Sequence, residues 1–151
     1  MRLYLVQHGE AKSEAEDPER SLTFRGEEET RKISGAAKRL DIHPSRVYRS
    51  GKKRAEQTAG IIAKALSLSA QFGQGLNPND DVHPWVERIS REEEDFMIVG
   101  HLPFLEKLAS FLVCGNEARR AVLFRYSAIL CLVKKDPGRW AVDWVLKPEM
   151  V

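Results

Sequence analysis

The sequence predicts an α/β fold, a three-layer α/β/α sandwich with a mostly parallel sheet and an antiparallel hairpin at one edge. Two patterns lead to this prediction. Short apolar runs without polar alternation, typical of strands buried on both faces, alternate with amphipathic helical segments. Two β-rich runs around a turn signal then follow near the C-terminus, as in a hairpin.

The chain has 151 residues, of which 42% are hydrophobic and 30% are charged. This length fits one domain, residues 1–151, and the composition argues against a disordered chain. The 24 basic and 22 acidic residues leave a net charge of +2, too balanced for a general nucleic-acid-binding protein. No apolar run reaches the roughly 20 residues of a membrane span, and residues 1–6 do not resemble a signal peptide. We therefore expect a soluble cytoplasmic domain, with Cys114 and Cys131 as free buried thiols.

The strands are predicted from their apolar runs. Buried strands are expected at residues 3–6, from residue 47, and at 96–99, with a less distinct one at 72–76. The edge hairpin is expected from residues 128–133 and 140–146, around Asp136-Pro137-Gly138.

The helices are predicted from apolar residues spaced three and four apart, and from their first residues. Thr23 can cap the first helix, and Pro103 suits the first turn of the last. A short helix is also expected at 85–91. The apolar faces are Ile33, Ala36, Ala37 and Leu40 in the first helix, Ala55, Ala59, Ile62 and Leu66 in the second, and Leu105, Leu108, Ala109 and Leu112 in the last.

Three polar side chains follow three separate predicted strands. His8 comes directly after the first strand, Arg54 shortly after the second, and His101 after the strand at 96–99. Each alone has an ordinary structural interpretation, such as a solvated turn for Arg54. Because ligands bind at the carboxyl ends of parallel strands, the three together predict a shared site at one edge of the sheet.

Two imidazoles and a guanidinium suit an oxyanion better than a metal ion. Arginine presents a planar fork of donors that matches phosphate oxygens, and Gly9 lets the backbone approach an anion closely. A neutral His8 can attack phosphorus, while a protonated His101 and Arg54 stabilise the oxygens. A metal site built from His8, His101 and His83 is disfavoured, because no pair lies at i, i+4 on a helix.

Four motifs resemble those of the histidine phosphatase superfamily, in the same order and at fitting separations. They are Val6-Gln7-His8-Gly9-Glu10-Ala11, Leu22-Thr23-Phe24-Arg25-Gly26, Ser50-Gly51-Lys52-Lys53-Arg54-Ala55-Glu56-Gln57-Thr58-Ala59, and Gly100-His101-Leu102-Pro103. The short length and Ser127-Ala128-Ile129 are similar to the branch of SixA-like phosphohistidine phosphatases.

The resemblance implies hydrolysis through a phosphohistidine intermediate on His8, with Arg54 and His101 binding the phosphoryl group. No cofactor or metal is expected. Gln7 stands where the family has its first arginine, so one charge-assisted contact, about 1 kcal/mol stronger than a neutral one, is missing. Arg20 is a hypothetical replacement for that charge. The remaining predicted substrate-binding residues are Gln7, Gly9 and Leu102.

The proton donor and the substrate are less clearly indicated. Glu10, Asp80 and Asp81 are candidate donors by position, with a solvated loop favoured for the two aspartates. A phosphohistidine substrate reduces the need for a proton donor, because imidazole can be protonated on its free nitrogen before it leaves. We expect a phosphorylated protein or a small phosphorylated compound as substrate. The alternative, motivated by Gln7, is a non-catalytic phosphate or phosphoprotein binding module.

Overall fold

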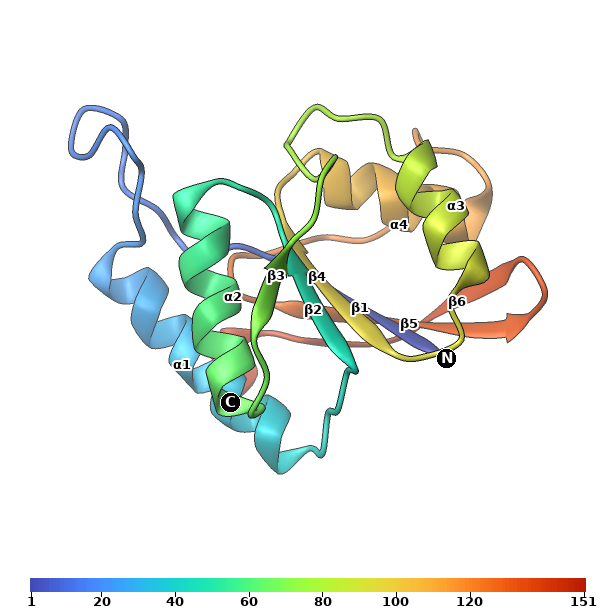
Figure 1. The fold of residues 1–151 in the computed structure, drawn as a ribbon, viewed down its shortest axis with the longest axis horizontal. Helices are drawn as coiled ribbons and strands as arrows, with labels where there is room; N and C mark the ends of the chain where they lie inside the picture. The colour runs from blue at the N-terminus through green and yellow to red at the C-terminus, as the bar shows by residue number, and fades with distance from the viewer.

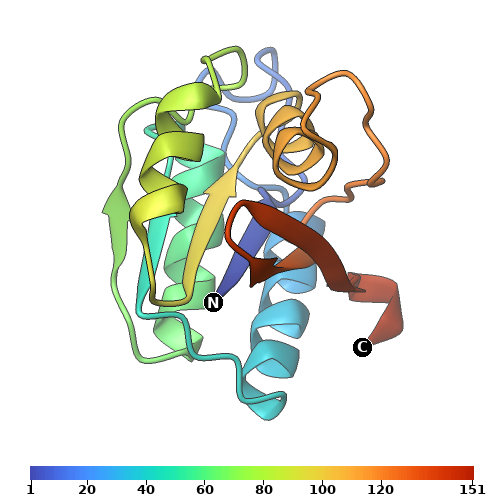
Figure 2. The ribbon, with the colours of Figure 1, turned by 90° about the vertical axis from the view of Figure 1, so that its right-hand side faces the viewer.

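The computed structural model describes residues 1–151, and its centre is a six-stranded sheet in the order β3-β2-β4-β1-β5-β6 (Figure 1). The strands are β1 (Arg2–Gln7), β2 (Arg46–Arg49), β3 (Ala70–Phe72), β4 (Phe96–Gly100), β5 (Ile129–Asp136) and β6 (Arg139–Leu146). The first four strands are parallel, and β5 is antiparallel to both β1 and β6. The predicted mostly parallel sheet with an antiparallel edge hairpin is confirmed, and Figure 2 shows that hairpin from its own side of the molecule.

Two helices cover each face of the sheet. The helices are α1 (Phe24–Arg39), α2 (Lys53–Ala65), α3 (His83–Arg91), α4 (Phe104–Cys114) and the short 3-10 helix η1 (Pro148–Met150). The pair α1 and α2 covers one face and the pair α3 and α4 the other (Figures 1 and 2). None of these helices has the length and apolar character needed to cross a bilayer.

Strand β1 is buried on both faces, as its apolar run predicts. Leu3 and Leu5 pack with α3 and α4, whereas Tyr4 and Val6 pack with α1 and α2. Because successive side chains of a strand point to opposite faces, Gln7 follows Leu3 and Leu5 on the α3 and α4 side. The strand therefore delivers its last residue, and His8 after it, to the carboxyl edge of the sheet.

Three predictions about local structure were wrong. Strand β3 ends at Phe72 instead of spanning 72–76, because its ladder with β2 pairs Val47 with Ala70 and the chain then turns. Leu40 is 59% exposed, since α1 ends one residue earlier and the buried Ile42 fills the core beyond it. Cys114 is exposed because it is the last residue of α4, past the helix's buried stretch, whereas Cys131 is a buried free thiol as expected.

Candidate functional site

His8, Arg54 and His101 meet at the carboxyl edge of the sheet. His8 follows β1, Arg54 lies in the first turn of α2, and His101 follows β4. The centroids of the two imidazole rings are 5.1 Å apart, and Arg54 Nε donates to His8 Nε2 at 3.3 Å. The structure thus brings together the three side chains that the sequence predicted to converge.

His8 is held as a neutral imidazole with one nitrogen available. Its Nδ1 lies 2.7 Å from the Gly9 carbonyl oxygen, which can only accept, so Nδ1 carries the proton. Burial, reinforced by the positive charges of Arg54 and Arg20, lowers the pKa of His8 to about 4. At neutral pH the unprotonated Nε2 therefore faces Arg54 with its lone pair, as a nucleophile requires.

His101 is oriented by Ser50. The Ser50 Oγ lies 2.5 Å from His101 Nε2 and accepts the Lys52 N–H at 3.3 Å, so the hydroxyl links the turn before α2 to the imidazole. The other ring nitrogen, His101 Nδ1, is buried without a hydrogen-bond partner. Burial, followed by the charges of His8 and Arg54, lowers the pKa of His101 to about 3, so these surroundings disfavour the protonated form that the sequence analysis expected.

Thr58 fixes the position of Arg54 relative to the His8 segment. Its hydroxyl donates to the Arg54 carbonyl at 2.7 Å and accepts the Gly9 N–H at 2.9 Å. Burial, with the charge of Arg20 as the next cause, lowers the pKa of Arg54. An arginine remains charged even so, and the guanidinium thus lies partly desolvated beside the His8 ring.

Gly9 approaches helix α1 more closely than any side chain would allow. A Cβ at this position would lie 2.9 Å from Thr30 Oγ1, 3.0 Å from the Gly26 carbonyl oxygen and 3.1 Å from Ser127 Oγ. Because the Gly9 N–H also bonds Thr58, this backbone is committed to internal contacts. A glycine is therefore required here by the packing against α1. The sequence analysis had instead explained Gly9 by a close approach to a bound anion.

Arg20 belongs to the loop before α1. The Asp17 carboxylate fixes that loop by accepting the N–H groups of Glu19 at 3.1 Å and Ser21 at 3.0 Å, and also the Ser21 hydroxyl. Arg20 Nε donates to the Lys12 carbonyl at 3.1 Å, and its backbone adopts a left-handed φ of 51°. Its charge contributes to the lowered pKa of both His8 and Arg54, so its guanidinium lies within electrostatic reach of the site.

Two other predicted substrate-binding residues lie next to the histidines in sequence. Gln7 is 8% exposed, and its Oε1 is buried without a hydrogen-bond partner. Leu102, directly after His101, packs partly buried against the cluster of apolar residues under α3 and α4. Gln7 thus offers an unused acceptor, whereas Leu102 contributes apolar packing.

The candidate proton donors have partners of their own. Glu10 Oε1 accepts the Thr23 hydroxyl at 2.9 Å, at the start of α1. Asp80 accepts the Asn77 N–H at 2.8 Å, and Asp81 lies 2.7 Å from His83 Nδ1. Of the three, Glu10 is the one beside the His8 segment, and the two aspartates belong to the exposed loop before α3.

His83 is separate from the two site histidines. Besides its contact with Asp81, its ring lies 5.1 Å from the ring of Phe111 in α4. The chain contains no group of three or more His, Cys, Asp or Glu side chains placed to hold a metal ion. The metal site considered from the sequence therefore has no geometric support.

Two neighbours of the site were missed by the sequence analysis. Ser50 begins the third of the four motifs, and the sequence analysis did not predict it as a site residue. Its position directly after a predicted strand was a signal that it lies at the carboxyl edge of the sheet. Tyr126 lies far along the chain in an irregular segment, and its ring centroid is 5.6 Å from that of His8. Nothing in the local sequence pattern distinguishes Tyr126, because only the fold brings it to His8.

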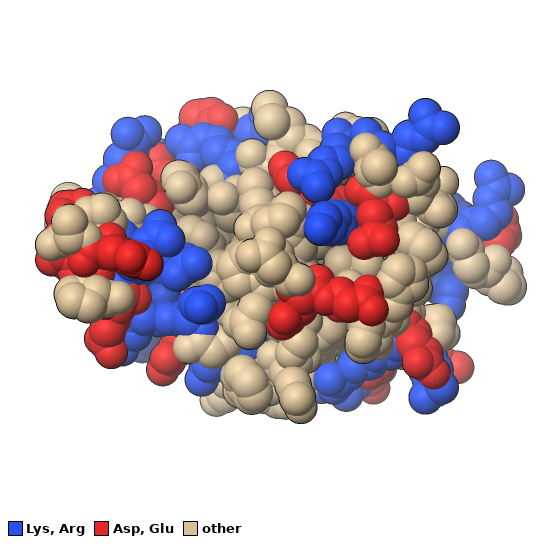
Figure 3. All heavy atoms as spheres, turned by 90° about the horizontal axis from the view of Figure 1, so that it is seen from above, with Lys and Arg blue, Asp and Glu red and all other residues tan.

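The site lies on an open face of the molecule. Figure 3 views the carboxyl edge of the sheet, where an uncharged centre is flanked by groups of both signs. The largest surface hollow, about 540 Å³, lies elsewhere, between α1 and α2, and is lined by Arg31, Lys38 and Lys64 among others. None of the surface hollows is lined by His8, Arg54 or His101, so the site lies outside any deep pocket.

The parallel strands β1, β2 and β4 bring two imidazoles and a guanidinium together at their carboxyl ends, a set of groups that suits a tetrahedral oxyanion. The model of the histidine phosphatase superfamily (branch 1) matches residues 3–80. The chain belongs to this superfamily, as the four motifs indicated.

Individual relatives extend over more of the chain. An uncharacterized protein of Picosynechococcus is 34% identical over 124 residues, covering 77% of this chain and 75% of the relative. The phosphohistidine phosphatase SixA of Escherichia coli is 28% identical over 155 residues, covering 98% and 94%. A structure of the protein histidine phosphatase SixA complexed with tungstate has a TM-score of 0.86 at 27% identity, covering 99% of each chain.

Proposed function

We propose that the chain is a phosphatase that removes the phosphoryl group of phosphohistidine through a covalent intermediate on His8. The observation that carries this proposal is the arrangement of His8, with Nδ1 bonded to the Gly9 carbonyl and Nε2 facing Arg54 at 3.3 Å. The similarity to SixA, a phosphohistidine phosphatase, supports the substrate class. No surface hollow is lined by His8, Arg54 or His101, which favours a phosphoryl group borne by a protein over one on an enclosed small molecule.

The proposed reaction has two displacements at phosphorus. The lone pair of His8 Nε2 forms a bond to phosphorus while the bond from phosphorus to the substrate imidazole breaks. The electron pair stays on the leaving nitrogen, and the proton on the other nitrogen keeps that imidazole neutral. Water then attacks the phosphorus on His8, the bond from phosphorus to Nε2 breaks, and its electron pair returns to Nε2. The proton that the water loses passes to a phosphoryl oxygen and leaves with inorganic phosphate.

The neighbouring donors are assigned to the phosphoryl oxygens. Arg54 supplies a charged fork, and His101, whose Nδ1 has no partner in the chain, supplies a further donor when that nitrogen is protonated. A phosphoryl dianion beside His101 also favours its protonated form, because opposite charge raises the pKa of an imidazole. We assign to Arg20 the positive charge that Gln7 lacks, because the charge of Arg20 already contributes to the lowered pKa values of His8 and Arg54.

The test is phosphate release from a phosphohistidine protein and from p-nitrophenyl phosphate by the wild type and His8→Ala. Wild-type turnover that His8→Ala abolishes, with an acid-labile phosphoryl label trapped on the wild-type chain only, is the expected result. Turnover retained in His8→Ala overturns the mechanism. The circular dichroism spectra of the wild type and His8→Ala show whether both proteins are folded.

Gln7→Arg tests the alternative, a non-catalytic binding module. That alternative starts from Gln7, whose buried Oε1 has no hydrogen-bond partner. In such a module the wild type binds phosphate without releasing it from substrates, and Gln7→Arg creates activity. A robust wild-type rate that Gln7→Arg leaves unchanged eliminates the module.

A further inference from the structure

Tyr126 occupies the mouth of the site beside the proposed nucleophile. Its ring centroid lies 5.6 Å from the His8 ring at an interplanar angle of 40°. Tyr126 is 39% exposed, whereas His8 is 7% and His101 1% exposed. Among the rings around His8, the tyrosine is therefore the one that an incoming group meets from solvent.

The segment that carries Tyr126 is held on both sides. Before it, Arg125 forms two contacts of 3.2 Å with Glu29 of α1 and a 3.0 Å contact with Glu149 of η1. After it, Ser127 donates its N–H to the Gln7 carbonyl at 3.0 Å, and its Oγ lies 2.8 Å from Thr30 Oγ1. The ring is therefore positioned in advance, although the segment has no regular secondary structure.

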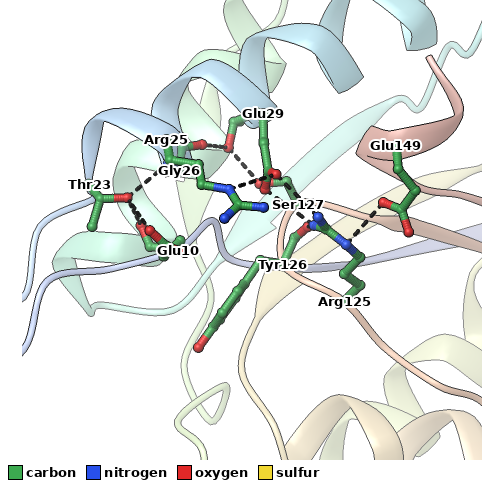
Figure 4. A network of polar contacts seen from close by, with 10 residues as sticks. Glu10, Thr23, Arg25, Gly26, Glu29, Arg125, Tyr126, Ser127 and Glu149 are labelled. Atoms are coloured by element: carbon green, nitrogen blue, oxygen red, sulfur yellow. Dashed lines mark hydrogen bonds and ion pairs between the residues drawn. The ribbon is translucent and has the colours of Figure 1, made fainter.

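The direction of the Tyr126 side chain separates it from that network. In Figure 4 the phenolic end points away from the ion pairs of Arg125, and the ring is not packed against Glu29 or Glu149. The face of the ring beside the site is thereby available to a ligand.

We propose that Tyr126 is a specificity-determining residue whose ring contacts the aromatic imidazole that leaves phosphorus. This inference rests on the proposed function. In an in-line displacement the leaving group lies on the side of phosphorus opposite His8 Nε2, which is the side open to solvent. Aromatic rings 4.5–7 Å apart attract one another, and one such contact corresponds to roughly a twofold to tenfold change in binding.

Two substrates with the same type of bond distinguish a contact between Tyr126 and the leaving ring from a general effect of Tyr126 on catalysis. Phosphohistidine and phosphoramidate both carry a phosphorus–nitrogen bond, but only the first has a ring in its leaving group. For the full chain, Tyr126→Ala is expected to lower kcat/KM on phosphohistidine by about twofold to tenfold and to leave phosphoramidate within about twofold. Tyr126→Phe, which keeps the ring, is expected to match the wild type on both substrates.

Leu123→Ala is the matched control, because Leu123 belongs to the same segment and is 78% exposed. It is expected to leave both rates unchanged. Equal losses on both substrates in Tyr126→Ala, or no loss on either, overturn the inference while leaving the proposed function standing. Loss in Tyr126→Phe overturns it too, since the hydroxyl would then be the active group. A wild type that releases phosphate from neither substrate removes the proposed function, and this inference with it.

Discussion

The hydroxyl of Ser50 and the Nε2 atom of His101 lie 2.5 Å apart, and this hydrogen bond holds the imidazole in its orientation at the site. Ser50 Oγ also accepts the Lys52 N–H at 3.3 Å, so the hydroxyl is held by the backbone of its own turn. The structure of the turn before α2 is in this way linked to the orientation of a residue that follows β4.

Ser50→Ala is expected to weaken both catalysis and folding. The variant leaves His101 Nε2 buried without its hydrogen-bond partner, and an unsatisfied buried polar group costs about 1–3 kcal/mol. The free energy of unfolding, from urea titration, should fall by that amount, and kcat/KM should fall because the orientation of His101 is no longer fixed. Ser90→Ala, which removes an exposed hydroxyl on α3, is the control and should change neither. Wild-type stability in Ser50→Ala would contradict the assigned contact.

Gly9→Ala should destabilise the chain by about 1–3 kcal/mol, since the added Cβ overlaps buried groups on three sides. Gly60→Ala is the matched control, because Gly60 lies inside α2 with nothing within 4 Å of an added Cβ. Alanine there should stabilise the helix by roughly 0.5–1 kcal/mol. Thermal and urea unfolding of the two variants should therefore move in opposite directions. Equal effects would show that the space around Gly9 adapts.

The stability of the chain should depend on pH through its two buried histidines. The pKa values of His8 and His101 are lowered to about 4 and about 3, whereas an unfolded histidine titrates near 6.5. Between roughly pH 6.5 and pH 4 the unfolded chain therefore binds more protons than the native chain. The free energy of unfolding should fall as the pH decreases across this window, by up to about 1.4 kcal/mol per pH unit for each histidine.

Urea titrations at several pH values measure this slope. His8→Asn should reduce it, and tungstate should reduce it in the wild type, since an oxyanion favours the charged imidazoles. Exposed His43 supplies the control, because His43→Asn removes a histidine that is 71% exposed. A slope that survives His8→Asn unchanged would contradict the burial of a neutral His8.

Glu10→Gln should distinguish substrates by their need for a proton donor. A phosphomonoester with an alkoxide leaving group needs an acid, and loss of a general acid costs about a hundredfold or more. Phosphohistidine can be protonated beforehand on the free nitrogen of its imidazole, which makes the ring a good leaving group, so its rate should remain within about twofold. The measurement is kcat on phosphoserine and on a phosphohistidine protein, with Glu14→Gln in the neighbouring exposed loop as control. Equal rates on phosphoserine for wild type and Glu10→Gln would exclude Glu10 as the donor.

Much of the fold and the centre of the site follow from local sequence patterns. The apolar run of β1 and the cap at Thr23, whose Oγ1 accepts the Gly26 N–H at 3.0 Å, are determined by neighbouring residues. The meeting of His8, Arg54 and His101 follows from the parallel direction of the strands they terminate.

Other features depend on contacts between distant segments, which local patterns do not contain. Tyr126 reaches His8 because Arg125 and Ser127 are bonded to α1 and β1, about a hundred residues earlier in the chain. The early end of β3 likewise depends on its pairing with β2. Local periodicity predicts the elements, and tertiary contacts determine their bounds and the outer residues of the site.

Arg54 lies beside the neutral imidazole of His8, and burial, followed by the charge of Arg20, lowers the pKa of Arg54. Such a centre attracts any tetrahedral dianion, and inorganic phosphate has the same shape and charge as the group being transferred. Departure of the product is therefore opposed by the force that recruits the substrate, and turnover should slow as phosphate accumulates.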